Sequence, residues 1–362
     1  MLVLGIETSC DECAAAVVED GAMIRSNVVA TQIPFHARWG GVVPEIASRK
    51  HTEWIDATVR EALDGAGLAV GDVDAVAATA EPGLLGSLLV GLTFGKAFAW
   101  TRGIPFVPVN HLYAHLYAAR LCGGHGDGGK DNCFAGSPPP YPYLGLLVSG
   151  GHSMICRVDD FDKITTLGTT LDDAAGEAFD KVGKHYGLPY PAGKYVDEMA
   201  KTGDEDAFLF PMPNLHKNGR PSDMSFSGLK NAVINQRETF RQRTRSVDGE
   251  GTAPSGENGG VRETADVIAS FQKAAVKILL RALFRAVDDT GITTVVAGGG
   301  VAANSCLRAR LAERTDIRAV FPPPELCGDN GAMVAGFAYH KLRGGDISVT
   351  ADACSTATGA AS

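Results

Sequence analysis

His111 and His115 stand four residues apart in the segment Asn-His-Leu-Tyr-Ala-His. On an α-helix this spacing places both imidazole rings on one face, with about 5–6 Å between their Cβ atoms. Two neutral imidazoles in such positions can bind one transition metal ion if further ligands come from elsewhere in the chain. An amphipathic helix with two half-buried histidines has the same spacing, so the spacing alone leaves both interpretations open.

An aspartate near the end of the chain offers a third ligand. Asp329 stands in Cys-Gly-Asp-Asn-Gly-Ala-Met, directly before a segment that we expect to be helical. It could act as the N-cap of that helix, or it could join the two histidines at a metal ion. Two histidines and one carboxylate leave coordination positions open, as a catalytic metal requires.

Three turns contain the polar and glycine residues that suit ligand binding, at 8–12, 148–153 and 298–304. Glycine lets backbone N–H groups come close to phosphate oxygens. The third turn, Gly-Gly-Gly-Val-Ala-Ala-Asn, also opens a predicted helix, whose N-terminal dipole favours an anion. The second and third turns together predict a nucleotide site, although a glycine turn without any ligand is the alternative for each.

An acidic segment at 172–181 carries Asp173, Glu177 and Asp180 on one face of a predicted helix. A solvated acidic face is one interpretation. The small residues between the carboxylates would also allow a ligand or a backbone segment to approach closely, which favours a functional role.

The elements that must position these residues follow a pattern that occurs twice. Apolar runs predict strands at 2–7, 14–18 and 23–29, and alternating helices and strands follow them. Strands at 143–149, 154–158 and 163–167 begin the same pattern again, with helices after them. The sequence therefore predicts an α/β fold of two duplicated lobes with a cleft between them.

The predicted domains are an N-terminal lobe at 1–121, a flexible connection rich in Gly and Pro at 122–142 and a C-terminal lobe at 143–345. The C-terminal lobe includes a flexible insertion at about 246–262, and a small polar tail follows at 346–362.

The 362 residues carry a net charge of −9, which argues against nucleic-acid binding through a broad basic surface but leaves room for a local basic patch. The start of the chain lacks the features of a signal peptide. The apolar run at 84–100 includes Ser87, Thr93 and Lys96 and fits a buried helix better than a membrane span. With eight scattered cysteines and no export signal, we expect reduced thiols, a cytoplasmic location and no membrane association.

Ordered motifs along nearly the whole chain resemble those of the TsaD family, which includes the archaeal and eukaryotic Kae-type proteins and proteins formerly named O-sialoglycoprotein endopeptidase. The matching segments are GIETSCDE at 5–12, GGVVPEIASRKH at 40–51, PGLLGSLLVG at 82–91, NHLYAH at 110–115, LLVSGGHS at 146–153, DDAAGEAFDK at 172–181, SFSGLK at 225–230, GGGVAAN at 298–304 and CGDNGAM at 327–333.

The resemblance implies a fold of the actin/Hsp70/sugar-kinase (ASKHA) type. It also implies transfer of a threonylcarbamoyl group from threonylcarbamoyl-AMP to N6 of the adenosine 3′ to the anticodon, in tRNAs that read ANN codons, which forms t6A. The implied partners are tRNA, a TsaB-like protein and a TsaE-like ATPase, with a TsaC-type enzyme making the adenylate. The implied cofactor is one divalent metal ion, with Fe²⁺ as first choice and Zn²⁺ as the alternative.

By the same resemblance, the site residues fall into three groups. His111, His115 and Asp329 match the metal ligands, and Asp11 and Glu12 match an acidic pair near the reacting group. The residues that match contacts to the adenylate are Leu147, Val148, Ser149, Gly150, Gly151, Asp180, Gly193, Asp197 and Asn304.

The chain departs from the family pattern in two places. Pro191-Ala192-Gly193-Lys194 stands where the family usually has Pro-Gly-Gly-Pro, and Glu81 stands where it usually has glycine. At the first departure, Gly193 retains the glycine in the position that the resemblance aligns with a contact to the adenylate.

Three other functions compete with group transfer. A metalloprotease would need His-Glu-x-x-His, and Leu112 occupies the position of its glutamate. An ATPase or sugar kinase of the same fold would not need both histidines, and a non-catalytic binding subunit should have lost them. The stretch 230–245 carries Lys230, Arg237, Arg241, Arg243 and Arg245, and is the best basic segment for tRNA phosphates, although a solvated helix face has the same appearance.

Overall fold

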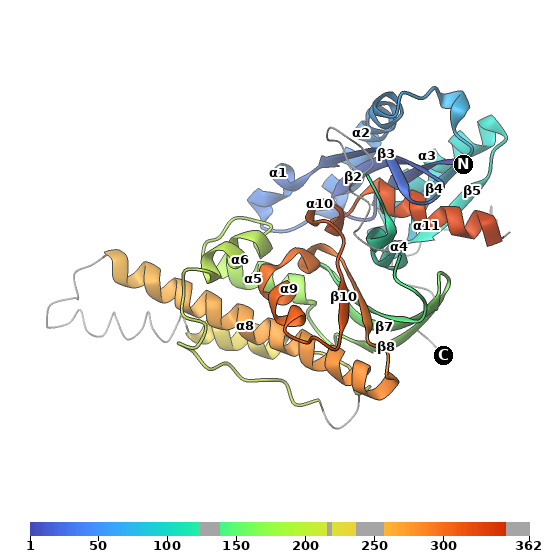
Figure 1. The fold of residues 1–362 in the computed structure, drawn as a ribbon. Coiled ribbons are helices and arrows are strands. Elements are labelled where there is room, and N and C mark those ends of the chain that lie inside the picture. The colour runs from blue at the N-terminus through green and yellow to red at the C-terminus, as the bar shows by residue number, and fades with distance from the viewer. Residues whose placement is uncertain (124–137, 216–218, 237–256, 345–362) are drawn as a thin grey trace, which may run out of the picture.

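Two five-stranded mixed sheets form the centres of two lobes in the computed structural model, which describes residues 1–123, 138–215, 219–236 and 257–344 (Figure 1). The first sheet has the order β3-β2-β1-β4-β5 and consists of β1 (Leu2–Glu7), β2 (Glu12–Glu19), β3 (Met23–Thr31), β4 (Ala75–Glu81) and β5 (Phe106–Asn110). The second sheet has the order β10-β9-β6-β7-β8 and consists of β6 (Tyr143–Val148), β7 (Ser153–Asp160), β8 (Lys163–Thr169), β9 (Thr294–Gly298) and β10 (Arg318–Val320).

The two sheets repeat one topology. In each, three consecutive strands pair antiparallel, and two later strands then add parallel to the first of them. A parallel partner needs a crossover connection, which explains why helices follow each meander in the sequence. The prediction of a duplicated α/β fold is confirmed.

The helices fill the connections between the strands. Those before the second sheet are α1 (Ile33–His36), η1 (Ala37–Trp39, a 3-10 helix), α2 (Pro44–Gly65), η2 (Val70–Asp72), α3 (Leu85–Arg102), α4 (His111–Tyr117) and η3 (Ala118–Arg120). The later ones are α5 (Ala175–His185), α6 (Gly193–Ala200), α8 (Glu257–Thr290), η4 (Gly300–Ala303), α9 (Ser305–Ala312), α10 (Pro324–Cys327) and α11 (Gly331–Gly344), and residues 227–236 are also helical.

Both faces of the first sheet are buried. Leu4 and Ile6 of β1 pack against α2 and α3, whereas Val3 faces the opposite side and packs against α11. Strands that are buried on both faces read as continuous apolar runs, which is why β1 shows no alternation of polar and apolar residues. The last helix thus returns to the first lobe, and Figure 1 shows this red helix beside the blue strands.

The second sheet is covered chiefly by the long helix α8 together with α5, α6 and α9. Their apolar side chains share one cluster with Leu144, Leu146 and Ile155 of the sheet. The boundaries predicted for the two lobes stay a prediction, and α11, from the segment predicted as the C-terminal lobe, packs against the first sheet. Parts of the predicted connection, insertion, basic stretch and tail, at 124–137, 237–256 and 345–362, lie outside the described residues.

The apolar run at 84–100 forms most of α3, as predicted, with Leu88, Leu92 and Ala99 buried on the side toward the sheet. None of the helices in the described part of the chain combines the length and apolar character that a bilayer crossing requires.

Gly5 allows β1 and α11 to pack with almost no space between their backbones. A Cβ atom at position 5 would stand 2.2 Å from the carbonyl oxygen of Gly331 and 2.5 Å from the backbone nitrogen of Ala335. We therefore expect Gly5→Ala to lower the free energy of unfolding by about 1–3 kcal/mol, because the helix must move to admit a methyl group.

Gly228→Ala is the matched control for this prediction. Gly228 is exposed and helical, and a Cβ atom there would meet nothing within 4 Å. We expect it to stabilise the protein by about 0.5–1 kcal/mol, since alanine favours the helix. Denaturant titrations measure both changes, and equal effects of the two variants would contradict the close approach of β1 and α11.

Candidate active site at the junction of the lobes

The helix that carries the two histidines begins at His111 because Asn110 caps it. The Asn110 side chain accepts hydrogen bonds from the backbone N–H groups of Leu112 and Tyr113, at 3.0 and 3.3 Å. Its amide group donates to Glu81 at 3.2 Å. Glu81 therefore stabilises the orientation of the cap, which gives a physical role to one of the two departures from the family pattern.

His111, His115 and Asp329 converge as predicted. Their ligand atoms all lie within 4.8 Å of one another. The Nε2 atoms of the two histidines are 3.2 Å apart, and Asp329 Oδ1 lies 3.1 Å from His115 Nε2 and 3.6 Å from His111 Nε2. Two imidazole nitrogens and one carboxylate oxygen that face a common point form a donor set suited to a divalent transition metal.

Glu7, the last residue of β1, holds the outer nitrogen of His111. Glu7 Oε2 lies 2.9 Å from His111 Nδ1 and accepts a hydrogen bond from the Thr79 hydroxyl at 2.5 Å, while Oε1 accepts from the backbone N–H of Ser9 at 2.5 Å. The carboxylate is fully buried and surrounded by donors. A carboxylate at Nδ1 keeps the proton there and leaves Nε2 free for a metal ion. Sequence reasoning missed Glu7, because nothing in an apolar strand indicates which distant ring its last residue meets.

Burial and neighbouring charges together set the protonation states of this cluster. Burial lowers the pKa of His111, but the carboxylates of Glu7 and Asp329 outweigh burial and raise this pKa to about 9. Burial and the neighbouring His111 lower the pKa of His115. Burial raises the pKa of Asp329, but the histidines outweigh it and hold the value at about 2. In the metal-free protein at neutral pH, the charged imidazolium ring of His111 thus lies between two ionised carboxylates, in a place that suits a cation.

A cavity of about 710 Å³ opens beside these residues, between the two lobes. Its wall includes the predicted residues Asp11, His111, Ser149, Gly150, Gly151, Asp180 and Asp329. It also includes Ser9, Cys10, Gly40, Gly41, Val42, Pro82, Gly83, Leu84, His152, Glu177, Lys181, Lys184 and Tyr190. Segments of both lobes therefore form one site.

The glycine turns serve two different purposes. A Cβ atom at Gly150 or Gly151 would meet nothing within 4 Å, so this turn leaves open space toward the cavity. Gly299 has a φ of +90°, and a Cβ atom there would stand 2.4 Å from the carbonyl oxygen of Val148, so it permits packing of the third turn against β6. The side chains of Leu147 and Val148 are fully buried in the core, which leaves only their backbone for a ligand.

Two groups of hydrogen bonds surround α6, one made by Asp180 and the other by Asp197 and Asn304. Asp180 Oδ1 accepts from the backbone N–H of Ala192 at 2.7 Å, just before α6 begins at Gly193. Asp197 accepts from Asn304 at 3.3 Å and from Gln272 at 3.1 Å. The structure thus brings Asp197 and Asn304 together from distant segments, and it adds Gln272 of α8, which the sequence analysis did not identify.

Asn304 uses its side chain fully within the protein. Its oxygen accepts from the backbone N–H of Leu307 at 2.9 Å and caps α9, while its amide group donates to Gln272 at 2.9 Å. Asp197 and Asn304 are not part of the cavity wall, so a ligand in the cavity would have to extend past the wall to contact them.

The two members of the acidic pair differ. Asp11 lines the cavity, whereas Glu12 accepts a hydrogen bond from the Thr31 hydroxyl at 2.8 Å and is not part of the wall. Burial, and then the carboxylates of Asp11 and Asp329, raise the pKa of Glu12 to about 9. Glu12 is therefore protonated at neutral pH in the metal-free protein.

The acidic face expected at 172–181 does not form as one helical face. The helix α5 begins only at Ala175, because Asp172 accepts hydrogen bonds from the backbone of Phe226 and Ser227 instead of joining it. Asp173 forms ion pairs with Lys181 and Lys230, at 2.8 and 2.5 Å. Of the three carboxylates in that prediction, Glu177 and Asp180 line the cavity and Asp173 does not.

The comparisons with known proteins agree on one family. Residues 23–336 match the family model described as "TsaD: tRNA N6-adenosine threonylcarbamoyltransferase". Proteins named tRNA N6-adenosine threonylcarbamoyltransferase from Treponema denticola, Treponema pallidum and Geobacter sulfurreducens are 56%, 50% and 49% identical to this chain. Each match covers 96% of this chain, and 94%, 91% and 93% of the respective relatives.

Solved structures share the fold at low sequence identity. Component A of (R)-2-hydroxyglutaryl-CoA dehydratase from Acidaminococcus fermentans is 15% identical, with a TM-score of 0.52, and the match covers 95% of this chain and 99% of that one. HypF from T. kodakarensis is 14% identical, with a TM-score of 0.55, and the match covers 95% of this chain and 48% of that one. These likenesses show the ASKHA-type fold alone.

The role of Glu7 can be tested with Glu7→Gln. The carboxamide must turn its NH₂ group either toward the Ser9 N–H, which leaves two donors facing each other, or toward His111 Nδ1, which moves the ring proton to Nε2. We expect the affinity for Zn²⁺, measured by chelator competition, to fall about 10- to 100-fold. Ser26→Ala, which removes a buried hydroxyl that contacts only Val17 of the neighbouring strand, should leave the affinity unchanged. An unaltered affinity in Glu7→Gln would contradict this role.

The pH dependence of stability should reveal Asp180. Burial is the main cause that raises its pKa from 3.8 to about 6. A carboxyl group with a raised pKa stabilises the fold fully below pH 3.8, and this contribution is lost as the pH rises through about 6. We therefore expect Asp180→Asn to be about 1–3 kcal/mol more stable than the natural protein at pH 7, with no difference near pH 3.5.

Asp56→Asn is the control, because Asp56 is exposed and pairs only with exposed Arg60. Urea titrations between pH 3.5 and 8 measure both variants. A gain of stability in Asp180→Asn that does not vary with pH would rule out the raised pKa as its cause.

Proposed function

Because the chain belongs to the TsaD family of tRNA N6-adenosine threonylcarbamoyltransferases, we propose that it transfers a threonylcarbamoyl group from threonylcarbamoyl-AMP to tRNA. The acceptor is N6 of the adenosine 3′ to the anticodon in tRNAs that read ANN codons, and the product is t6A. The observation that supports this proposal most is the convergence of His111, His115 and Asp329 beside the open Gly150–Gly151 turn and Asp11.

The donor is a mixed anhydride with an activated carbonyl carbon. The adenine N6 atom forms a bond to this carbon, the bond from the carbon to the phosphate oxygen breaks, AMP leaves, and N6 loses one proton. An adenine amine is a weak nucleophile, so positioning of both substrates in the cavity carries much of the rate.

His111, His115 and Asp329 would hold a divalent metal ion, with Fe²⁺ as first choice and Zn²⁺ as the alternative. When bound, this ion would supply Lewis-acid polarisation of the threonylcarbamoyl end of the donor. Glu7 orients His111 for that task through the hydrogen bond at Nδ1. The buried position of His115, which lies fully inside the protein, fixes the second ring by packing.

Asp11 is our candidate for the group that accepts the proton from N6. Its carboxylate lies on the cavity wall, where a substrate amine can reach it. Glu12 is less suited as a base, since its pKa of about 9 keeps it protonated at neutral pH and Thr31 occupies one of its oxygens. We assign Glu12 the task of holding Asp11 and the start of β2 in position.

The adenylate end of the donor would bind on the side of the second lobe. Backbone N–H groups of the open Gly150–Gly151 turn suit phosphate oxygens, and Asp180 with the network of Asp197 and Asn304 supplies polar groups for the nucleoside. Gly193 is half-buried and remains part of this proposal, because a Cβ atom there would meet nothing within 4 Å and Ala192 fits against Gly183 without closing that region.

The fold alone would also suit an ATPase or a sugar kinase. Such an enzyme needs no pair of buried histidines with a facing aspartate, so the metal-ligand cluster favours group transfer. We also propose a TsaB-like protein and a TsaE-like ATPase as partners, a TsaC-type enzyme as the source of the adenylate, and a cytoplasmic location, where tRNA is available.

Two variants should separate the metal end of the site from the adenylate end. His115→Ala should lose the metal and the transfer activity while its affinity for AMP is retained, because α4 lies apart from the α6 network. Asn304→Ser should keep the metal and weaken AMP binding by about 1–3 kcal/mol, because the amide that holds Asp197 and Gln272 in place beside α6 is lost. Serine retains an oxygen that can cap α9, so the helix itself stays intact.

Elemental analysis, calorimetry with AMP and transfer to an unmodified tRNA transcript measure these effects. His340→Ala is the control, since this histidine on α11 contacts Tyr117 rather than the cavity. Full metal content and full transfer in His115→Ala would show that the histidine pair is structural, and the ATPase or sugar-kinase function would then be the better proposal.

A further inference from the structure

An exposed aromatic and basic surface borders the mouth of the cavity. Trp39 ends η1 and directly precedes Gly40, Gly41 and Val42, which line the cavity. Lys184 of the second lobe also lines it, and its Nζ atom donates to the backbone oxygen of Trp39 at 3.3 Å. Trp39 therefore stands where the two lobes meet at the entrance.

The rings on this surface are not needed for the core. Trp39 is 57% exposed and Phe35 is 40% exposed, and neither ring belongs to the apolar clusters of the described core. The Phe35 ring contacts Trp54 edge-on, at 5.7 Å between ring centroids. Large exposed rings next to a cavity mark a surface that another molecule covers.

Cations stand beside both rings. The Arg38 guanidinium lies 5.2 Å from the centre of the Trp39 ring, and Lys50 Nζ lies 4.8 Å from the centre of the Phe35 ring. Lys184 adds a third positive group at the entrance. The acidic neighbour Glu53 pairs with Lys50 at 2.6 Å and offsets its charge, so Arg38 and Lys184 supply the excess positive charge of this surface in a chain whose net charge is −9.

Buried hydrogen bonds fix the position of the segment that carries the rings. His36 is fully buried, and its Nδ1 atom accepts a hydrogen bond from the backbone N–H of Val43 at 3.3 Å. Its Nε2 atom donates to Gln32 Oε1 at 3.3 Å. The backbone N–H of Gln32 donates to the backbone oxygen of Asp11 at 2.9 Å. The rings are thus presented at a defined position relative to the acidic pair.

We propose that Phe35, Arg38, Trp39, Lys50 and Lys184 form a binding surface for the unpaired nucleotides of the tRNA anticodon loop, an inference that rests on the proposed function. Unpaired bases stack on aromatic rings and arginine planes, and cations beside the rings contact the phosphates. An adenosine that enters the cavity must leave the stack of its own loop, and neighbouring bases then need another surface to stack on. This surface, which we call the aromatic rim, lies at the point where they emerge.

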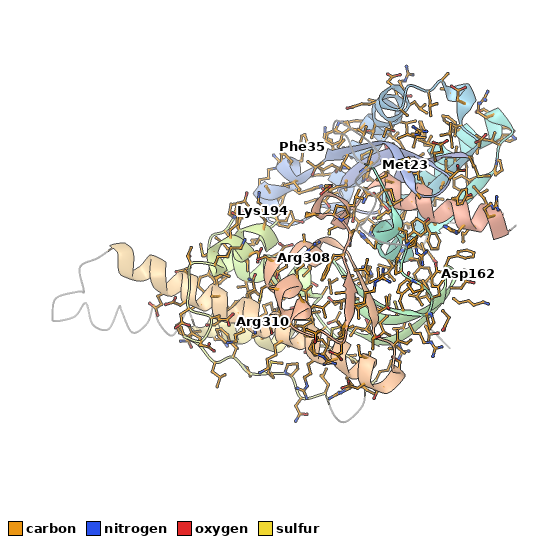
Figure 2. All side chains as sticks on the ribbon, in the orientation of Figure 1. Met23, Phe35, Asp162, Lys194, Arg308 and Arg310 are labelled. Atoms are coloured by element: carbon orange, nitrogen blue, oxygen red, sulfur yellow. The ribbon has the colours of Figure 1, made fainter. Side chains whose placement is uncertain are left out.

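The basic stretch at 230–245 is a weaker candidate for that contact. Lys230 is tied to Asp173 by an ion pair of 2.5 Å, and its four arginines lie outside the described residues. The aromatic rim, in contrast, adjoins the cavity. Figure 2 shows Phe35 at the left end of the first lobe and Lys194 of α6 below it, on the second lobe. The Lys194 side chain is 80% exposed.

The first test measures RNA binding directly. The chain has three tryptophans, so Trp54→Phe together with Trp100→Phe leaves Trp39 as the only one. Titration with an unmodified anticodon stem–loop RNA at low salt should quench its fluorescence. Binding of the same labelled RNA, measured by anisotropy, should weaken about 5- to 100-fold in Trp39→Ala and recover largely in Trp39→Phe. Arg38→Ala should reduce the slope of log affinity against log salt by about 0.7–1.

Trp100→Ala is the matched control. Trp100 is 85% exposed, and it stands at the opposite end of α3 from the cavity residue Leu84. It should leave RNA binding unchanged. In all variants, AMP affinity and metal content should also be unchanged.

The second test measures transfer in the complete reconstituted system, where Trp39→Ala should raise the KM for tRNA with little change in the KM for the adenylate. Unchanged RNA affinity and unchanged KM in Trp39→Ala, with an active natural protein, would overturn the aromatic rim and leave the proposed function intact. Weakened binding of a partner protein with unchanged RNA affinity would overturn it in favour of a protein interface. Loss of RNA binding in Trp39→Ala, with no transfer by the natural protein in the complete system, would support the rim and overturn the proposed function.

Discussion

The site depends on the position of α4, because this short helix carries both histidines and packs against both lobes. Ala114 and Tyr117 belong to the core under the first sheet, whereas Leu112 and Leu116 lie against the second sheet. A helix of seven residues is not stable alone in water, so tertiary packing and the Asn110 cap must maintain it. A shift between the two sheets would therefore displace the imidazole rings directly.

The duplicated topology explains why groups from distant segments meet at this helix. β1 and β5 are connected by parallel pairing through β4, so their carboxyl ends lie at one edge and bring Glu7 and His111 together. In the second sheet, β6 and β9 are parallel neighbours, and their carboxyl ends lead into the Ser149–Gly151 turn and the Gly299 turn. Open α/β sheets place ligand sites outside such edges. Here two such edges face each other across one cavity.

Local patterns allowed the fold and the histidine pair to be predicted, but they could not identify every partner. Strand periodicity and turn residues are properties of neighbouring positions, and they predicted the two meanders correctly. Glu7 and Gln272 were missed because each acts through a residue of another segment, which no local pattern reveals. The start of α5 was predicted too early because Asp172 bonds to the backbone at 226 and 227, a contact between segments that no local pattern contains.

The two departures from the family pattern show how the same geometry tolerates different residues. Glu81 replaces a residue without a side chain, and its carboxylate accepts a hydrogen bond from Asn110, so the added group stabilises the cap instead of disturbing it. Ala192 adds a methyl group in a buried position, where Gly183 leaves room for it, since a Cβ atom at position 183 would stand 2.2 Å from that methyl. In both places the backbone contact that matters is retained: the N–H of Leu112 still meets its cap, and the N–H of Ala192 still meets Asp180. The constraint on this site therefore falls on hydrogen bonds that orient helices α4 and α6, and side chains may vary where they leave these bonds in place.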